Sequence, residues 1–485
     1  MPPGARASRN CGNCRAVKRR CDQQLPHCGQ CIRLREECPG YRDEWELVFH
    51  DQTSHTIKRS KGKQTNAALT ETKHSPPIRG PSPSADEVGV NYFLYHFVIG
   101  GPSPSRGYLN YVPAVYSADG EHPTLVASMA AVGLAALANA TQQPELAKHA
   151  RAKYWEAIQN VNAALASPAE SVKDSTLMSV ISLTLFEHVS HFETWFRHIQ
   201  GAVALVVSRG KSQFSSPAAV LMFNQVRADM SAACIHSLRP FPSEMLELQD
   251  EATKHADTSS GFWLLGVLAT RCSNLLSNVT HKKSAPLAGY IEEATVLQSD
   301  FQHVLQILTK QEPYTTTRTS SGDPEIFYNG RSDLYQTSWA IRVWNNARML
   351  QIVVCEVKFH LLNRMLATAM TPPCRTQIET KLKETLQILL TLGDDLLASV
   401  PQALGHVSSV SEPITSINSS THASVSGRYL LMWCLYTVGK SPVTGSSTRK
   451  WVMRRLRDIG ENAGIAMALQ FVDDVDEIDK LAGQL

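Results

Sequence analysis

The sequence lacks a long apolar run. Residues 125–138 form its longest apolar stretch, which has fourteen residues and includes Ser128 and Gly133, whereas a membrane-spanning helix needs about 20 residues. The first ten residues, MPPGARASRN, contain no apolar segment of the kind that secretory signals carry. We therefore expect an intracellular protein without a membrane partner, in which residues 125–138 form a core helix.

Motifs of known catalytic sites are also missing. The chain contains no GxSxG, no HExxH and no dinucleotide-binding glycine pattern, and Cys434 stands where the GKS of residues 439–441 would need the first glycine of a phosphate loop. His188 and His191 lie three residues apart, but no third metal ligand is evident near them. We therefore expect a partnered histidine pair rather than a metal site, and we expect no enzyme.

Strand-type alternation of apolar and polar residues is rare, and helical periodicity dominates from Asp86 onward. The predicted helices lie within residues 86–101, 123–142, 144–166, 171–190, 192–208, 217–238, 261–279, 291–309, 333–371, 377–399, 424–438 and 447–471. The expected fold is a small zinc-stabilised N-terminal module with two short helices, followed by a large all-α body of stacked antiparallel helices.

Cysteines, by contrast, are concentrated near the N-terminus. Six of the eleven lie within 28 residues, and the first three recur seventeen residues later, so that each half reads C-G-[N/Q]-C-x6-C. The six are Cys11, Cys14, Cys21, Cys28, Cys31 and Cys38. The other five are isolated along the chain, and we expect them to be reduced thiols. They are Cys234, Cys272, Cys355, Cys374 and Cys434.

The regular spacing predicts a zinc cluster. A closed structural zinc site takes four ligands and favours thiolates, so six thiolates complete two sites only if two of them bridge both metals. Cys11 and Cys28, the first of each half, are the symmetric choice for the bridges. The other two cysteines of a half are seven residues apart, which predicts that both lie on one side of a short helix. A disulfide framework, and a zinc cluster that serves only folding or protein contact, remain as alternatives.

The two halves of the repeat differ in charge. The predicted first helix carries four cations and no acid, whereas the second half balances two arginines with two glutamates. The four cations are Arg15, Lys18, Arg19 and Arg20. On a helical wheel Lys18 lies about 40° from the cysteine stripe. Because such a helix can neutralise phosphates and reach base edges in a major groove, we expect the first half to contact DNA and the second half to support it.

The block resembles the fungal binuclear zinc cluster transcription factors. The cysteine spacings, the basic run after Cys14 and Pro26 in the loop between the halves match that family's pattern, while Val17 stands where some members have a basic residue. The resemblance implies two zinc ions per chain and a nuclear location. It also implies that Lys18 contacts the bases, with the other three cations nearby, and that the module recognises a CGG-like triplet.

A second, weaker resemblance lies in the body. Residues 195–202 read W-x-x-H-x-x-G-A, which is similar to the regulatory helical domain of one subgroup of these factors, with His198 at the matching position. The resemblance implies a regulatory or ligand-responsive domain without an established reaction. The periodicity by itself predicts a core helix in which Gly201 permits close approach of a neighbour. The apolar stripe of that helix consists of Trp195, Ile199, Ala202 and Val206.

We expect four regions: a disordered lead (1–10), the zinc cluster domain (11–41), a basic linker rich in proline and serine (42–85) and the all-α regulatory domain (86–485).

The basic cluster at 58–63 fits a nuclear import signal or a solvated linker, and the apolar patch at 41–49 fits docking or partner binding. Residues 471–485 fit an amphipathic helix, which we favour, or an acidic activation segment. No heptad pattern indicates a zipper.

These patterns together predict a nuclear, zinc-dependent, sequence-specific regulator of RNA polymerase II transcription. Its expected partners are double-stranded DNA and the transcription machinery or coregulators, with a homodimer through the helical body left open. The alternative is a zinc-stabilised scaffold or corepressor that acts through its body without reading DNA. A deep pocket with converging ionisable groups in the body would instead favour an enzyme.

Overall fold

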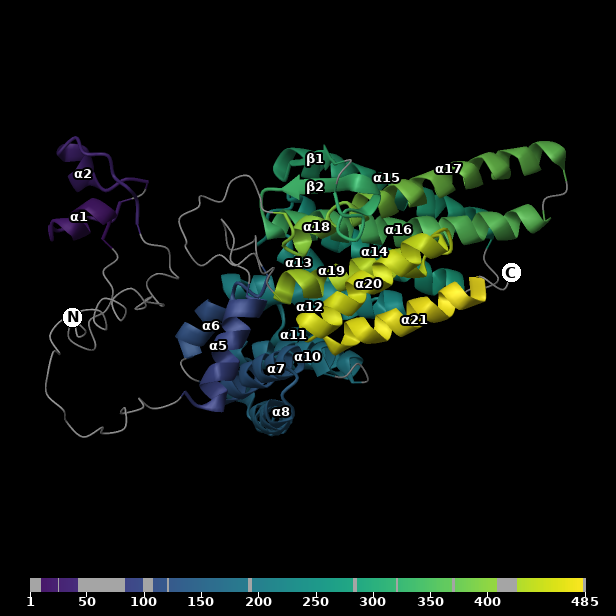
Figure 1. Cartoon of the computed structure of the whole chain (residues 1–485). Helices are drawn as coiled ribbons and strands as arrows, with labels where there is room; N and C mark the ends of the chain where they lie inside the picture. The colour runs from purple at the N-terminus through teal and green to yellow at the C-terminus, as the bar shows by residue number, and fades with distance from the viewer. Residues whose placement is uncertain are drawn as a thin grey trace, which may run out of the picture. The chain divides into compact units, whose positions relative to one another are not determined.

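The computed structural model describes residues 10–24, 26–41, 83–98, 108–119, 122–190, 194–281, 286–319, 322–368, 371–407 and 425–482. The chain divides into two compact units, Met1–Pro81 and Ser82–Leu485. The first unit contains α1 (Gly12–Ala16) and α2 (Gly29–Arg33), drawn in purple in Figure 1. The predicted linker, the apolar residues after Tyr41 and the basic cluster at 58–63 lie almost entirely outside the described residues.

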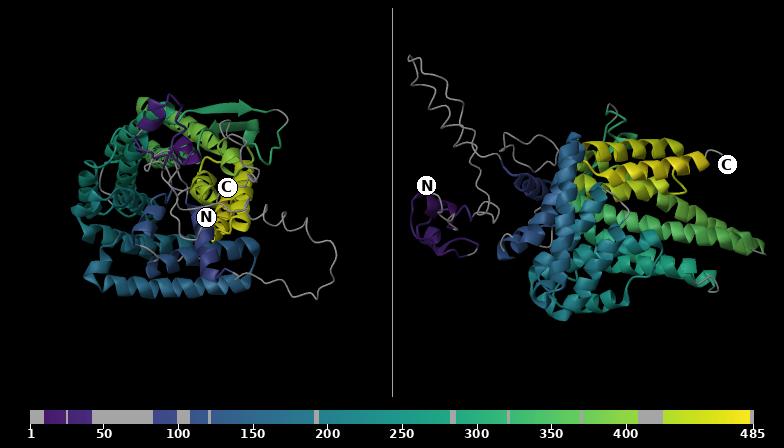
Figure 2. Two further views of the ribbon diagram at one scale, coloured as in Figure 1. Left: turned by 90° about the vertical axis from the view of Figure 1, so that its left-hand side faces the viewer. Right: turned by 90° about the horizontal axis from the view of Figure 1, so that it is seen from below.

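The second unit is largely helical, as predicted, and its described part contains one two-stranded antiparallel sheet (Figures 1 and 2). Its elements are α5 (Ala85–Phe97), α6 (Val112–Asp119), α7 (Pro123–Thr141), α8 (Pro144–Leu165), α9 (Pro168–Ser171), α10 (Asp174–Ser190), α11 (Trp195–Arg209), η1 (Lys211–Ser215), α12 (Pro217–Ser237), α13 (Ser243–Ala252), α14 (Gly261–His281), α15 (Leu287–Gln311), β1 (Tyr314–Arg318), η2 (Tyr328–Gly330), β2 (Arg331–Tyr335), α16 (Ser338–Thr368), α17 (Pro372–Leu397), α18 (Val400–Ala403), α19 (Val425–Lys440), α20 (Ser446–Asn462) and α21 (Ala466–Ala482).

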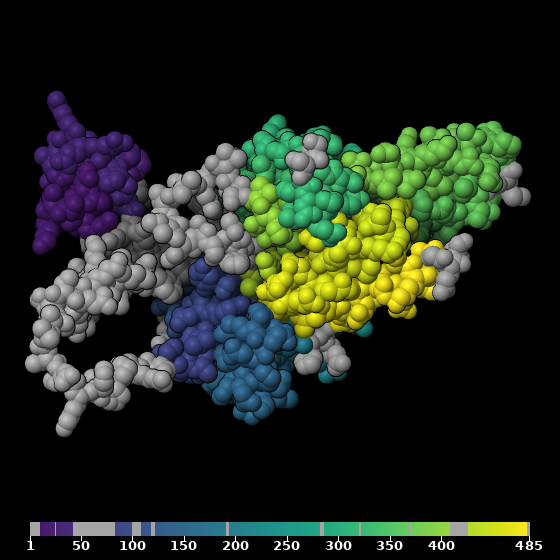
Figure 3. Space-filling view, viewed as in Figure 1, coloured from purple at the N-terminus to yellow at the C-terminus, as the bar shows by residue number. Residues whose placement is uncertain are grey.

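Consecutive helices form hairpins. α7 packs on α8, α16 on α17 and α20 on α21, and the two helices of each pair are separated by only a few residues in the sequence. The α7–α8 turn uses Gln142 in the left-handed conformation (φ 53°), and Pro144 then opens α8 at its first turn, where its missing N–H costs nothing. The α16–α17 pair extends beyond the rest of the unit as a separate green lobe (Figure 3).

α7 packs chiefly against three other helices, α5, α8 and α10. By length and composition it could span a membrane, yet 72% of its most apolar window is buried inside the unit. Two glycines explain its close packing on α5. A Cβ on Gly133 would fall 1.9 Å from the carbonyl oxygen of Gly89, and a Cβ on Gly89 would fall 2.6 Å from that of Ala130. The backbones of α5 and α7 therefore meet only because both positions lack a side chain.

The predicted role of Gly201 in close helix approach was wrong. A Cβ at Gly201 would meet only Cγ1 of Val180, at 3.8 Å, which is an ordinary van der Waals contact. The apolar stripe of α11 was predicted correctly, because all four of its residues are buried. The close helix approach that needs glycine is thus between α5 and α7 rather than at α11.

The predicted helix at 333–371 began too early. Residues 331–335 form β2, which pairs with β1 in the register Tyr314↔Tyr335, and α16 starts only at Ser338. The three consecutive threonines of β1 favour the extended conformation. The rings of Tyr314 and Tyr335 stack with centroids 4.8 Å apart, so cross-strand packing outweighs local helical periodicity here.

The C-terminal segment forms an amphipathic helix, the interpretation that we favoured. Phe471, Val472 and Val475 of α21 are buried against the unit. Two of its acids also contact neighbouring helices: Asp474 accepts a hydrogen bond from Tyr436 at 3.2 Å, and Asp479 accepts one from Ser446 at 2.9 Å. Several of its acidic side chains therefore take part in tertiary contacts.

Candidate metal centre and nucleic-acid interface

The sequence repeat in the first unit is also a repeat of backbone conformation. Cys11 and Cys28 each precede a five-residue helix, α1 and α2. Lys18 and Arg35, seventeen residues apart, both have φ 53°, and a second pair with the same separation also has positive φ. That pair is Gln23 (φ 57°) and Gly40 (φ 80°). The two halves thus follow the same path.

The prediction that one short helix carries the last two cysteines of each half was wrong. α1 ends at Ala16, and the left-handed Lys18 turns the chain so that the N–H of Arg19 bonds to the carbonyl of Cys14 at 2.9 Å. Cys21 follows this turn on a non-helical segment. Because Lys18 is not helical, its predicted wheel position beside the cysteine stripe was wrong as well. A helix this short has too few internal hydrogen bonds to extend on its own.

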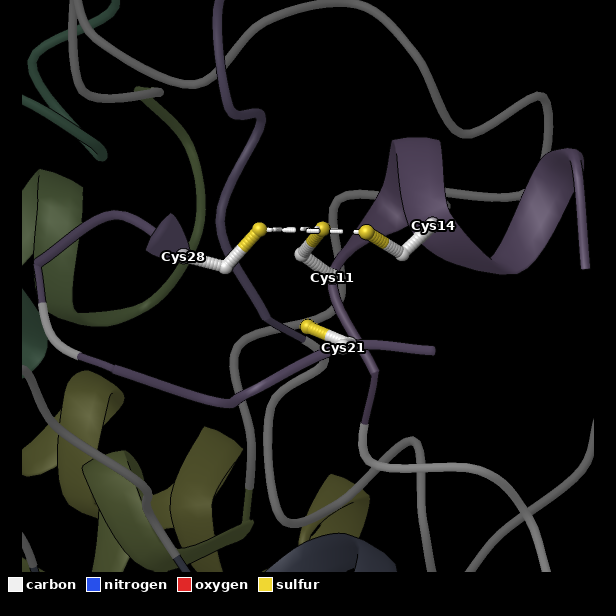
Figure 4. A group of neighbouring side chains, drawn as sticks. All are labelled: Cys11, Cys14, Cys21 and Cys28. Atoms are coloured by element: carbon white, nitrogen blue, oxygen red, sulfur yellow. Dashed lines mark hydrogen bonds between the residues drawn. The ribbon is translucent and has the colours of Figure 1, made fainter. Parts of the chain in front are cut away.

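The six sulfurs form two overlapping groups. Within each group of four, all sulfur atoms lie within 4.8 Å of one another, and Cys11 and Cys28 belong to both groups. The groups are Cys11, Cys14, Cys21 and Cys28, and Cys11, Cys28, Cys31 and Cys38. Figure 4 shows the side chains of the first group converging. The Sγ atoms of Cys11 and Cys28 are 3.5 Å apart, and those of Cys14 and Cys28 are 3.8 Å apart.

These distances fit zinc. Two thiolates on one zinc ion, each about 2.3 Å from it in a tetrahedron, have sulfurs about 3.8 Å apart. The donor set is purely thiolate and is nearly closed to solvent, since five of the six cysteines are buried and Cys21 is half-buried. Both features are typical of a structural zinc site rather than a catalytic one, which keeps an open coordination position.

The described residues of the module form no core other than the sulfur cluster. Among its described residues only five are buried, and all five are cysteines. Tyr41 packs beside them, half-buried, and its hydroxyl donates a hydrogen bond to the carbonyl of Gln24. A unit of this size cannot be stabilised by so little apolar burial, so its folding free energy must come from metal–sulfur bonds.

The glycine of each C-G-x-C has a steric reason. A Cβ on Gly12 would fall 2.8 Å from Cγ of Pro39, and a Cβ on Gly29 would fall 2.5 Å from Oδ2 of Asp22. Pro39 and Asp22 are themselves equivalent positions of the repeat. The chain of each half therefore passes close to the first turn of the other half's helix, where a side chain is absent.

The thiols differ in acidity. Burial raises the pKa of Cys31 to about 11 and raises the pKa of Cys11 further above its usual value. Hydrogen bonds from the backbone N–H groups of Cys28 and Gly40 lower the pKa of Cys38 to about 6. Metal binding must therefore displace protons from the thiols of Cys31 and Cys11.

The four predicted DNA-contacting cations have different surroundings. Lys18 and Arg20 are exposed, and their side chains make no hydrogen bond or ion pair within the described part of the chain. Arg15 donates to the carbonyl of Asn10 at 3.1 Å. Arg19 is paired with Glu36 across the two halves, a contact that sequence reasoning missed. The repeat offered a signal for it, because the two residues occupy equivalent positions.

Arg35 is a further cation that sequence reasoning set aside. It occupies the position of Lys18 in the second half, has the same positive φ and is exposed. It was assigned to the supporting half because Glu36 and Glu37 follow it. Glu36, one of these two acids, is paired with Arg19. The backbone at Arg35 has the same conformation as the backbone at Lys18.

The comparison with known families is decisive for this module. Residues 9–45 match the fungal Zn(2)-Cys(6) binuclear cluster domain. The chain therefore contains a zinc-binding module of a type found in DNA-binding transcription factors, which are nuclear proteins, and the matched family is not an enzyme family. No curated protein and no solved structure matches the chain. The resemblance of residues 195–202 to a regulatory domain is not part of this match and stays a prediction.

Histidines in the body are engaged in hydrogen bonds. His188 is buried, and its Nδ1 lies 2.8 Å from the hydroxyl of Tyr429, while His191 lies outside the described residues. His198 contacts the hydroxyl of Tyr154 at 2.9 Å, and that hydroxyl donates to Glu187 at 2.7 Å. Within the described part of the chain, the metal-ligand groups consist of the N-terminal cysteines alone.

Proposed function

We propose that the chain is a nuclear, zinc-dependent, sequence-specific regulator of RNA polymerase II transcription. Two zinc ions would be held by the six cysteines, with Cys11 and Cys28 bridging both. The observation that carries this proposal is the pair of four-sulfur groups that share these two cysteines. Zinc supplies the bonds that fix the backbone of the module, and the protein residues supply the contacts to DNA.

Lys18 is proposed to contact base edges, and Arg20 to contact phosphate. Both are exposed and are not engaged by acids within the described residues, and they follow α1 directly. The left-handed turn at Lys18 sets it at the end of the helix rather than along its side, which supports an end-on approach of the module to a major groove. A CGG-like triplet is the proposed target, because lysine and arginine pair well with guanine O6 and N7.

Arg15 and Arg19 are proposed to contribute mainly through the fold of the DNA-binding surface. Arg15 is tied to the carbonyl of Asn10 and Arg19 to the carboxylate of Glu36. Both remain positively charged, so they add to the electrostatic attraction for phosphates. The all-α unit, Ser82–Leu485, is proposed to regulate this activity and to provide any dimer contact.

Selection from random duplexes with the zinc-loaded full chain tests the proposal. We expect an enriched GC-rich triplet and a binding constant that falls with salt. Lys18→Ala should weaken the selected site by roughly 10- to 100-fold, whereas Arg35→Ala should have a small effect. Arg35 is a matched control, since both residues are exposed and have the same φ.

Two results would count against the proposal. A fully metallated chain that enriches no sequence would favour the scaffold or corepressor alternative. Equal losses from Lys18→Ala and Arg35→Ala would show that both halves contact DNA, which would overturn the assignment of reading to the first half.

A further inference from the structure

A cavity lies within the helical unit. Its volume is about 160 Å³, and its walls come from four helices, α12, α14, α16 and α19, whose positions Figure 1 labels. Cavities of about 150 Å³ in other proteins admit benzene. The volume therefore suits a ligand of roughly six to ten non-hydrogen atoms.

One wall of the cavity carries a buried cation without an acid. Arg227 of α12 is 2% exposed and takes part in no ion pair within the described chain. Its Nη1 donates to Oε1 of Gln249 at 3.0 Å, while its Nε has no hydrogen-bond partner. The guanidinium lies over the ring of Trp263, 4.4 Å from the centroid. A guanidinium binds a carboxylate through two parallel N–H groups, and Arg227 keeps donors available for this.

The backbone leaves room for this cation. A Cβ on Gly266 of α14 would fall 2.1 Å from Nη2 of Arg227, so the guanidinium packs directly against the helix at this glycine. Burial lowers the pKa of Arg227 to about 9, which still leaves it charged at neutral pH. A buried charge without a partner is costly, and an anionic ligand would remove that cost.

The remaining charges favour an anion as well. Arg342 and Lys440 also line the cavity, against one carboxylate, Asp229. Burial raises the pKa of Asp229 to about 6, although its hydrogen bond with Gln225 and the charge of Arg342 oppose the rise. The lining thus holds three cations and one carboxylate. The other walls are largely apolar and include four aromatic residues, Phe262, Tyr429, Trp433 and Tyr436.

The arrangement suits binding better than catalysis. The hydroxyl of Ser231 donates to the carbonyl of Arg227 at 2.9 Å, and Oδ1 of Asp229 accepts from Gln225 at 2.8 Å. Neither group is therefore placed as a nucleophile or as its base. The ionisable groups that converge here are thus mainly cations.

We propose that this cavity binds a small organic acid with a flat apolar body, whose carboxylate pairs with Arg227 and whose body packs on the apolar walls and their four aromatic rings. The site lies entirely within the helical unit. The inference goes beyond DNA binding and does not depend on it.

4-Fluorobenzoate, observed by fluorine NMR with the zinc-loaded full chain, is the probe. We expect a dissociation constant of roughly 1 mM or tighter. 4-Fluorobenzamide, which has the same shape without the charge, should bind at least about tenfold more weakly. Arg227→Met should weaken the acid by roughly 10- to 100-fold, while Arg271→Met, which removes an exposed arginine paired with Asp300, should leave its affinity unchanged.

A second variant covers the case in which Arg227→Met does not fold. Ala232→Leu fills space at the cavity wall and leaves every charge in place, so it should weaken the acid while the chain stays folded by circular dichroism. The proposal is overturned if the wild-type chain does not bind the acid, or if acid and amide bind alike. It is equally overturned if a folded Arg227→Met or Ala232→Leu chain keeps the wild-type affinity. These results would leave the DNA-binding proposal untouched.

Discussion

Arg19 pairs with Glu36, its equivalent in the second half of the N-terminal repeat. Nη1 of Arg19 donates to Oε1 of Glu36 at 3.2 Å, and Nη2 donates both to Oε2 of Glu36 and, at 3.8 Å, to the sulfur of Cys31. The charge pair holds the carboxyl pKa of Glu36 below its usual value. One guanidinium thus joins the two halves and touches the sulfur cluster from outside.

Removing this guanidinium should loosen the metal site. Groups that hydrogen-bond metal ligands typically change metal affinity by roughly 10- to 100-fold, so we expect Arg19→Ala to weaken zinc binding by about tenfold. Competition with a coloured chelator measures the change. Arg20→Ala is the control, because Arg20 is the exposed neighbour without such a contact, and its zinc affinity should stay at the wild-type value. Equal zinc affinities in the two variants would contradict the role of Arg19.

Salt should weaken DNA binding in proportion to the phosphate contacts. Each phosphate contact contributes about 0.9 to the slope of log K against log salt concentration, so we expect Arg20→Ala to reduce that slope by about 1. Titrations at several salt concentrations measure the slope. Arg375→Ala, on the exposed surface of α17 and paired with Glu379, should leave it unchanged. An unaltered slope in the Arg20 variant would remove Arg20 from the proposed interface.

Chelation of zinc should unfold the N-terminal module alone. Its described buried residues are all cysteines, whereas the helical unit has its own extensive apolar core. We therefore expect excess chelator to abolish DNA binding and to leave the urea unfolding midpoint of the helical unit unchanged. The far-ultraviolet circular dichroism signal should fall only slightly, because α1 and α2 together contain ten residues. A matching loss of the body's cooperative transition would show that the two units are coupled.

Gly133→Ala should destabilise the helical unit strongly. The new Cβ would lie 1.9 Å from the carbonyl oxygen of Gly89, and separating α5 from α7 should cost about 3 kcal/mol or more of unfolding free energy. Gly201→Ala is the control at an exposed glycine within α11 that has space for a methyl group, and it should stabilise α11 by roughly 0.5–1 kcal/mol. Denaturant unfolding measures both. Similar effects of the two changes would contradict the packing described for α5 and α7.

Stability of the helical unit should fall in acid through His188. Burial lowers the pKa of His188 to about 3, below its value near 6.5 in an unfolded chain. Between these values the unfolded state binds more protons than the folded state, so the free energy of unfolding decreases as the pH falls from about 6.5 to about 3. The slope should be up to about 1.4 kcal/mol per pH unit. A folded His188→Phe chain should lose this contribution, and an identical pH profile would rule it out.

Much of the fold and of the candidate site follows from the sequence, because their signals are local. The spacing of the six cysteines is a property of the chain itself, and so is the helical periodicity of the body. The stripe of α11 and the amphipathic nature of α21 were read from side-chain period alone. For these helices the burial of one face decides the structure, and the apolar face can be found without knowing which residues it packs against.

The remaining features depend on contacts that periodicity does not reveal. The left-handed turns at Lys18 and Arg35 use residues that seldom adopt positive φ, so nothing in their type marks the end of α1 or α2. The glycine contact between α5 and α7 pairs positions 44 residues apart. The lone Arg227 in the cavity looks like an ordinary helical arginine until its burial is known. Tertiary packing decides each of these.

The all-cysteine interior of the N-terminal module makes free zinc a variable of the protein's own folding equilibrium. Because the buried residues that the structure describes there are all cysteines, the population of the ordered module rises and falls with the zinc activity of its surroundings, while the helical unit keeps its structure. A scarcity of the ion would leave chains whose cavity in the helical unit is intact and whose N-terminus is unstructured.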